Sequence, residues 1–345
     1  MLKLKDLTYD ELCGFIVGQG EKKFRASQLF RRMYAGGASD FEDFSELSKS
    51  LRNRLSEIST LTAVTVADRQ RSKDGTAKYL FALDDGNAIE SVFMKYSYGN
   101  SACVSSQSGC RMGCRFCASG ANGLARNLTA GEIADQVVQM EIDTGESISH
   151  IVLMGTGEPF DNYDNVAKAI RILHDERGKN LSLRNITVST CGILEYFERF
   201  AQELPQVNLA VSLHAPDDET RRRIMPVAGK YSMDSLLTEC KRYTQKTHRR
   251  ITFEYALISG LNDAPEQAEK LAGRLKGMLC HVNLIPLNSV DHRDGAGPGY
   301  NGSTRRQAES FASVLSGKGI ETTIRRSLGT DISAACGQLV YSSVK

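Results

Sequence analysis

Three cysteines lie close together in one short segment of the sequence, CVSSQSGCRMGCRFC. Cys110, Cys114 and Cys117 have the spacing CxxxCxxC, and Cys103 begins the same segment. Thiolates that are close in sequence can converge on one metal centre at little loop-closure cost. A structural zinc site usually takes four ligands from two paired elements, and no CxxC or HxxxH partner follows here. Three thiolates on a [4Fe–4S] cluster leave one iron open, so the spacing favours an iron–sulfur cluster that binds a further ligand.

A second set of candidate residues follows short apolar runs. Gly157 and Glu158 lie in GTGEP after one run, and Ser189 ends the next. Later runs are followed by Ser212, His214 and Asn288. A glycine-rich turn or a single histidine is usually structural when it occurs alone. In a parallel barrel, however, functional residues follow the carboxyl ends of the strands, so their recurrence at successive strand ends indicates a binding site.

The remaining candidates are isolated residues. Cys336 lies in the small-residue segment DISAACGQ, where both a reactive thiol and an inert loop cysteine are possible. Glu90 lies among apolar neighbours in an expected strand, where a solvent-facing position is the commoner interpretation. The other cysteines are expected to be small buried residues; they are Cys13, Cys191, Cys240 and Cys280.

Alternating strands and helices must position these residues. The expected strands are Ala102–Ser106, Ser149–Met154, Asn185–Ser189, Asn208–Leu213, Thr252–Ile258, His281–Pro286 and Glu321–Arg326. Helix starts are expected at Thr129, Asp263 and Thr304, each followed by Glu or Gln. Repeated strand–helix–strand units predict a parallel sheet with right-handed crossovers. The fold class is therefore α/β, with a curved, partial (β/α)6 barrel favoured over a flat doubly wound sheet.

The chain divides into four expected regions. Residues 1–60 form an N-terminal helical accessory domain, and 61–100 form a linker with a β-hairpin of strands 79–83 and 88–94. Residues 101–290 form the partial barrel, and 291–345 form a C-terminal extension that carries Cys336. The glycine-rich stretch 288–303 is expected to be a flexible loop.

Composition restricts the class of protein further. The net charge of +2 does not by itself indicate a nucleic-acid binder. The N-terminal region nevertheless has a basic cluster, for which a solvated helix face and a phosphate-binding surface both remain open; it comprises Lys22, Lys23, Arg25, Arg31 and Arg32. The charged first residues and the lack of a long apolar run predict a cytoplasmic protein with no membrane segment. Clustered cysteines favour metal chemistry in a reducing compartment over a disulfide framework.

These motifs together resemble a known family, the radical S-adenosylmethionine (SAM) methyltransferases of the RlmN and Cfr group, which modify adenine in 23S ribosomal RNA and in tRNA. The similarity covers nearly the whole chain, and its longest segments are EKKFRASQLF, CVSSQSGC, CRFCASG, MGTGEPFDNYDNV, ITVSTCGI, VSLHAPDDETRRRIMPV, ITFEYALISGLND, HVNLIPLN and TDISAACGQL. Two positions depart from the family pattern, which usually has Asp where Ser333 stands and commonly Met where Thr156 stands.

The resemblance implies a role for each candidate residue. Cys110, Cys114 and Cys117 would hold the [4Fe–4S] cluster. The SAM site would be lined by Gly157, Glu158, Ser189, Ser212, Leu213, His214 and Asn288. Cys336 would accept a methyl group, and Cys103 would release the product by forming a disulfide bond with Cys336. Glu90 would accept the proton from carbon 2 of the adenine.

The family's activity also implies cofactors and partners. The expected reaction methylates carbon 2 of an adenine in the peptidyl-transferase centre of 23S rRNA and of the adenine beside the anticodon in certain tRNAs. It would use two SAM molecules per turnover and an electron donor such as flavodoxin or ferredoxin. The protein is expected to be a monomer whose N-terminal helices contact RNA.

Three alternatives stay open at this stage. A sibling enzyme methylates carbon 8 of the same nucleotide with the same cysteines, although Glu158-Pro159 and NLIPLN look like the carbon-2 group. A radical SAM activase that acts on a partner protein is disfavoured by the segment around Cys336. A zinc-binding RNA module without enzymatic activity would lack iron and sulfide.

Overall fold

The fold is organised around one large sheet. The computed structural model describes residues 1–121, 123–288, 299–339 and 342–343. The strands of the sheet are ordered β14-β13-β12-β11-β10-β9-β6-β5-β4-β3. The parallel part comprises β6 (Gly99–Cys103), β9 (Ile148–Leu153), β10 (Ile186–Thr190), β11 (Asn208–Ser212), β12 (Ile251–Leu257), β13 (Cys280–Pro286) and β14 (Glu321–Ile324). Among the described strands, β14 and β3 do not pair with each other, so the sheet is open. The predicted partial barrel is confirmed.

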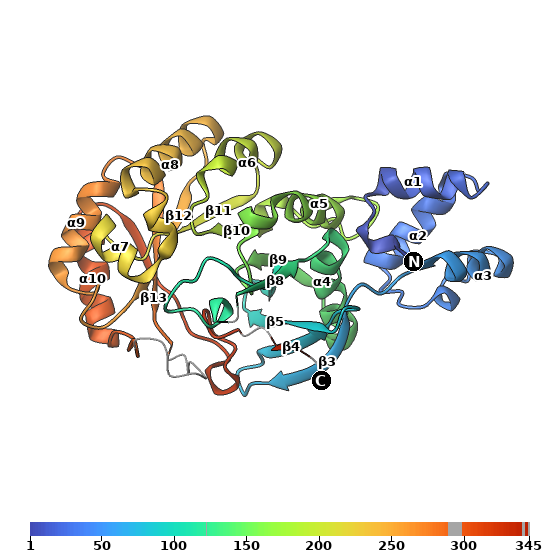
Figure 1. Ribbon diagram of the computed structural model, residues 1–345, viewed down its shortest axis with the longest axis horizontal. Coiled ribbons are helices and arrows are strands. Elements are labelled where there is room, and N and C mark those ends of the chain that lie inside the picture. The colour runs from blue at the N-terminus through green and yellow to red at the C-terminus, as the bar shows by residue number, and fades with distance from the viewer. Residues whose placement is uncertain (122, 289–298, 340–341, 344–345) are drawn as a thin grey trace.

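Helices between the parallel strands cover the outside of this sheet (Figure 1). They are α4 (Ala130–Thr144), α5 (Tyr163–His174), α6 (Phe197–Glu203), α7 (Asp218–Ile224), α8 (Met233–Thr247), α9 (Pro265–Leu275) and α10 (Arg305–Gly317). Thr129 and Thr304 cap α4 and α10 through reciprocal bonds with the residue three positions on, as the sequence predicts. The predicted cap at Asp263 is wrong, because Ala264 occupies that position and Asp263 binds Gly260 N–H and the Ser303 hydroxyl instead.

Antiparallel strands extend the sheet beyond β6. The predicted hairpin is formed by β4 (Ala77–Ala82) and β5 (Asn87–Tyr96), and β5 pairs with β6. The sequence prediction did not include β3 (Thr65–Arg71), which pairs with β4, or the small sheet of β7 (Gln107–Gly109) and β8 (Leu124–Asn127). Near the C-terminus, β15 (Ser342–Ser343) pairs with β5. The antiparallel strands therefore pair on one side with β6, the first parallel strand, and also with a strand from the C-terminal region.

The N-terminal helices lie at one end of the molecule, remote from α8, α9 and α10 (Figure 1). They are α1 (Tyr9–Gly18), α2 (Phe24–Tyr34) and α3 (Lys49–Ile58), and short parallel strands β1 (Leu2–Lys3) and β2 (Ser59–Thr60) close this region. A fully buried ion pair of 2.5 Å joins Lys5 Nζ to Asp135 Oδ1 on α4. The other oxygen of Asp135 accepts from the Ala63 and Val64 N–H groups. This pair fixes the N-terminal helices to the barrel, since a buried carboxylate without its partner is strongly destabilising.

The hydrophobic core is continuous across these regions. One cluster of buried side chains extends from Leu12 in α1 to Leu315 in α10. Most of the predicted loop 288–303 lies outside the described residues, although Gly302 forms an isolated bridge with Ile258. Over the part of the chain that the structure covers, no helix is long and apolar enough to cross a membrane.

Candidate active site at the carboxyl ends of the strands

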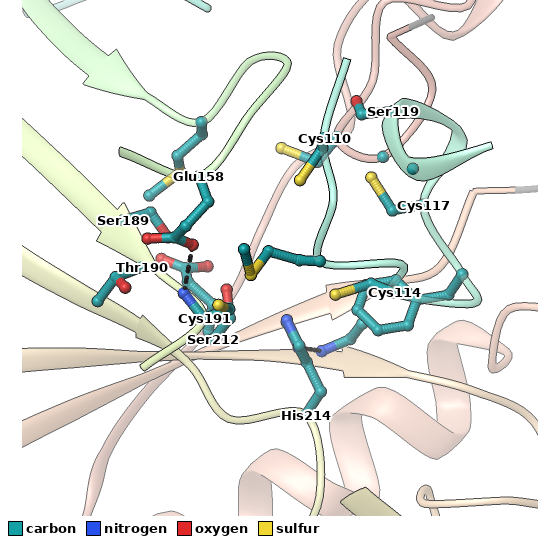
Figure 2. Close-up of a pocket in the computed structure, with 18 of the residues that line it drawn as sticks. Cys110, Cys114, Cys117, Ser119, Glu158, Ser189, Thr190, Cys191, Ser212 and His214 are labelled. Atoms are coloured by element: carbon teal, nitrogen blue, oxygen red, sulfur yellow. Dashed lines mark hydrogen bonds between the residues drawn. The ribbon is translucent and has the colours of Figure 1, made fainter. Parts of the chain in front are cut away.

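One pocket at the carboxyl ends of the parallel strands collects most of the predicted site residues. Its lining includes Cys110, Cys114, Cys117, Gly157, Glu158, Ser189, Ser212, His214 and Cys336. The three clustered cysteines lie on one side and Glu158, Ser189 and Thr190 on the other (Figure 2). The strand ends β9, β10 and β11 bring the second group together because neighbouring parallel strands end at the same edge of the sheet.

The cysteine loop is tightly folded and its thiols are shielded. Gly113 has a φ of 64°, and a Cβ on Gly120 would lie 3.3 Å from Gly113 Cα, so small residues allow this close turn. Burial raises the pKa of Cys110 to about 12, and the nearby Cys117 adds to the shift. Burial, followed by Cys117 and Cys110, also raises the pKa of Cys114. These thiols would need nearby cations in order to ionise.

The arrangement suits a cluster better than a single ion. Within the described residues, no group of three His, Cys, Asp or Glu side chains is placed to hold one metal ion. A [4Fe–4S] cube does not require such convergence, because each cysteine binds a different iron. Three shielded thiols around one pocket are therefore a fitting donor set for a cluster with one iron left open.

Glu158 is held rigidly in the pocket wall. Its two carboxylate oxygens accept hydrogen bonds from Cys191 N–H at 2.7 Å and Phe160 N–H at 3.0 Å. Its own N–H donates to Gln107 at 2.8 Å. Burial raises the pKa of the Glu158 carboxyl, whereas the bond from Cys191 lowers it. The Thr190 and Cys191 side chains also interact with this carboxyl, and a buried carboxylate surrounded by such neutral donors can bind a cationic ligand group.

His214 is a neutral hydrogen-bond donor. Its Nδ1 accepts from Ala256 N–H at 2.8 Å, which leaves the proton on Nε2. Burial, assisted by the Arg221 guanidinium, lowers the pKa of His214 to about 3. The ring packs edge-on against Phe116 from the cysteine loop, with centroids 4.8 Å apart. Its φ of 55° places His214 in the left-handed region directly after β11.

The turn after β9 explains the GTGEP motif. Gly157 has a φ of 109°, and a Cβ there would lie 2.6 Å from Gln107 Cβ, so no other residue fits. Thr156, one of the two departures from the family pattern, is fully buried, and its hydroxyl has no hydrogen-bond partner among the described residues.

A smaller adjoining pocket contains the two remaining thiols of interest. Its lining includes Cys103, Cys336 and Arg325, and Cys336 and Arg325 line the first pocket as well. Burial raises the pKa of Cys103 to about 12, while Arg325 lowers it. Cys336, the largest of several influences, raises the pKa of Arg325. A guanidinium therefore lies near both thiols and can stabilise a thiolate.

Backbone hydrogen bonds hold the Cys336 loop against the cysteine loop. Ala118 N–H donates to Gly337 O at 2.8 Å, and Ser119 Oγ donates to Leu339 O at 2.8 Å. On its other side, Gly329 N–H donates to Asp74 in the β3–β4 turn. Ser333, the second departure from the family pattern, is exposed with a φ of 50°. The loop thus places Cys336 between the cluster cysteines and Cys103.

Besides Cys103, three predicted residues lie apart from the first pocket. The Leu213 side chain is fully buried in the core, and its carbonyl accepts from Arg221. Asn288 lines the smaller pocket. Glu90 shares a face of β5 with Val92 and Met94, which pack with Cys103, but it lines neither pocket and forms a 3.1 Å ion pair with Lys78.

The sequence prediction missed several residues of the site. Glu254 lines the first pocket from β12, and Arg325 lines it from the segment after β14. Arg221 is fully buried and donates to Cys191 O at 2.8 Å. Arg221 lies in the RRR run of α7, where a solvated face is the usual interpretation. Arg325 lies inside the expected strand Glu321–Arg326, whereas β14 ends at Ile324, so the sequence does not show it as a residue at a strand end.

The N-terminal basic cluster is only partly exposed. Arg25 donates to Glu46 O, and Arg32 donates to Asp43 O, so both hold local structure. Lys22, Lys23 and Arg31 are exposed.

Comparisons with known proteins agree with this geometry. Residues 104–272 match the family model described as the radical SAM superfamily, and residues 2–61 match the ribosomal RNA large subunit methyltransferase N-terminal domain. A solved radical SAM methyltransferase from Sphaerobacter thermophilus superimposes with a TM-score of 0.94 at 44% identity, covering 98% of this chain and 99% of that one. The fold and the cysteine loop thus define a radical SAM enzyme.

Two curated relatives specify the family. The chain is 49% identical over 340 residues to a probable dual-specificity RNA methyltransferase RlmN from Lachnospira eligens, covering 98% of this chain and 96% of the relative. It is 48% identical over 346 residues to the protein of the same name from Clostridium tetani, covering 100% and 97%. The chain belongs to the RlmN family of radical SAM methyltransferases, as the motifs predict.

Proposed function

We propose that this chain methylates carbon 2 of an adenine in 23S rRNA and of the adenine beside the anticodon in tRNA. The position of Cys336 supports this most strongly. Its neighbour Gly337 is hydrogen-bonded to the cysteine loop, and the Arg325 guanidinium lies near both Cys336 and Cys103. The RlmN relatives favour carbon 2 over the carbon-8 alternative.

The pocket residues have distinct roles in this proposal. Cys110, Cys114 and Cys117 would hold the cluster, and Glu158 would bind the SAM ammonium group. His214 would donate from Nε2, while Ser189, Ser212 and the backbone at Gly157 would complete the site. Asn288 and the main chain at Leu213 would form the edge of the SAM site. When bound, the cluster and two SAM molecules supply the electron, the methyl group and a carbon radical.

The two thiols would act at different stages. Cys336 accepts the methyl group as a thiolate, and Arg325 stabilises that charge. Once the methyl carbon is joined to the adenine, Glu90 removes the ring proton. The Cys103 thiolate then attacks the Cys336 sulfur, and the bond between this sulfur and the transferred carbon breaks. The carbon keeps the bonding electrons and takes up a proton to become the methyl group, the two cysteines form a disulfide, and the unpaired electron would return to the cluster. All nine cysteines are free in the structure, so this disulfide would exist only during turnover.

The same proposal assigns the regions and partners. Residues 1–60 would contact RNA, 61–100 would support the thiol loop, 101–290 would hold the cofactors and 291–345 would carry the methyl acceptor. We also keep the predictions of a cytoplasmic monomer and of flavodoxin or ferredoxin as the electron donor.

Mass spectrometry of nucleosides tests the reaction directly. The anaerobically purified protein is incubated with SAM, a reductant and unmodified 23S rRNA or tRNA. We expect 2-methyladenosine in the digest. Formation of 8-methyladenosine, or of no methyladenosine by protein with a full cluster, would contradict the proposed function.

A further inference from the structure

A second cavity lies at the opposite, amino ends of the same strands. Its volume is about 800 Å³, and its lining includes Thr187, Asn208, Thr252 and His281 from the first residues of β10 to β13. Met154, Glu254 and Arg325 line both this cavity and the catalytic pocket. These three side chains therefore separate the two spaces inside the open barrel.

The cavity is rich in cations. Four arginines line it, namely Arg249, Arg250, Arg325 and Arg326, and Glu254 is the one acidic residue among the described residues of its lining. Asn283 donates a 2.8 Å hydrogen bond to Glu254, which engages one oxygen of that carboxylate. Arg250 pairs with Glu321 at the rim. Arg326 is exposed and has no hydrogen bond or ion pair with any described residue. The surplus of positive charge suits a polyanion.

Two stacked tyrosines form one wall of the cavity. The Tyr96 and Tyr98 rings lie 4.9 Å apart with an interplanar angle of 10°, and Tyr98 is 64% exposed. Tyr96 and Arg326 also line the smaller pocket, which contains Cys103 and Cys336. An exposed aromatic ring beside an exposed arginine such as Arg326 is a combination that binds single-stranded nucleic acid, in which bases stack and phosphates pair with cations.

We propose that this cavity binds the single-stranded RNA that flanks the target adenine. A neighbouring base would stack on Tyr98, a phosphate would contact Arg326, and the target base would pass beyond Met154 and Arg325 toward Cys336. This inference rests on the proposed RNA substrate, but it assigns RNA contacts to the barrel, in addition to the N-terminal helices.

Binding of an anticodon stem–loop RNA, followed by fluorescence anisotropy over a range of salt concentrations, tests the site. Tyr98→Ala should weaken binding about tenfold, because one base loses the ring on which it stacks. Tyr98→Phe keeps an aromatic ring and should retain the affinity. Arg326→Gln should lower the salt slope by about one unit. Arg242→Gln on α8, which removes another exposed cation outside the cavity, should change neither quantity.

Unchanged affinity and salt slope in both Tyr98→Ala and Arg326→Gln would overturn the proposal. If these variants bind RNA normally but are reduced more slowly by flavodoxin, the cavity serves the electron donor and the proposal also fails. Binding is measured separately from methylation. If the cavity variants weaken RNA binding but the protein methylates no RNA, the proposed function alone is contradicted. If the protein methylates RNA and the cavity variants bind RNA normally, this inference alone is contradicted.

Discussion

The pocket contains two groups of cysteines that differ in their electrostatic surroundings. Cys110, Cys114 and Cys117 are shielded, and Cys110 and Cys114 have pKa values raised by burial and by neighbouring thiols. Cys103 and Cys336 instead lie near the Arg325 guanidinium. Burial raises the pKa of Cys103 as well, but there the Arg325 guanidinium opposes the shift. The protein therefore supplies a cation to the second group, whereas a bound metal would supply it to the first. The same side chain is thus assigned to cluster binding in one place and to group transfer in the other.

The largest expected effect comes from removing a cluster ligand. Cys114→Ala should abolish the cluster and all methylation, because two thiolates cannot replace three. Iron and sulfide content and visible absorption of anaerobically reconstituted protein provide the measurement. Cys103→Ala is the matched control and should keep a full cluster. A Cys114→Ala protein that retains a full cluster and turns over would refute the distinction between the two groups.

Glu158→Gln should weaken SAM binding by about 10- to 100-fold, since a charge-assisted hydrogen bond is lost. Because burial raises the pKa of Glu158, the carboxylate becomes protonated at a higher pH than an ordinary glutamate. SAM affinity of the unmodified protein should therefore fall as the pH is lowered, and that of Glu158→Gln should not. Calorimetric titrations at several pH values would show this, and parallel pH profiles would count against a carboxylate–ammonium contact.

Arg325→Gln sharpens the comparison from the side of the second group. Without the guanidinium, Cys336 should react several-fold more slowly with iodoacetamide at neutral pH, because the attacking sulfur loses the cation beside it. Arg325→Lys should restore most of the rate, and the cluster content should not change in either variant. Peptide mass spectrometry follows the alkylation of Cys336. Equal rates in all three proteins would mean that Arg325 has only a structural role.

The smallest effect is expected from the exposed residues of the N-terminal basic cluster. The triple variant Lys22→Gln, Lys23→Gln and Arg31→Gln should lower the salt slope of RNA binding by up to about one unit for each phosphate contact. SAM cleavage should be unaffected. A matched triple variant on and just after α10, in which Arg305, Arg306 and Lys318 become Gln, removes the same exposed charge elsewhere. If the two triple variants behave alike, the cluster is a solvated helix face.

The sequence predicted the parts of this site that are local in the chain. Gly157 and Glu158 could be found because a glycine turn and a carboxylate directly follow a strand, and the CxxxCxxC spacing is itself a short loop. Arg325 could not be assigned, because its role depends on a contact with Cys103, which lies on the other side of the barrel. The amino-end cavity escaped notice for the same reason, since each strand contributes only one or two residues to it. The sequence predicts a helix cap at Asp263 because its side chain suits that role, but the Ser303 hydroxyl donates to this carboxylate instead.

Trapping of RNA tests most directly whether Cys103 and Cys336 have separate roles. Cys103→Ala protein expressed in cells should carry RNA covalently attached through Cys336, because the adduct forms but cannot be released. On a denaturing gel it should migrate slowly before ribonuclease treatment and normally afterwards, and Cys336→Ala in the same chain should abolish the slow species. Normal migration of Cys103→Ala together with an unchanged rate of RNA methylation would contradict the claim.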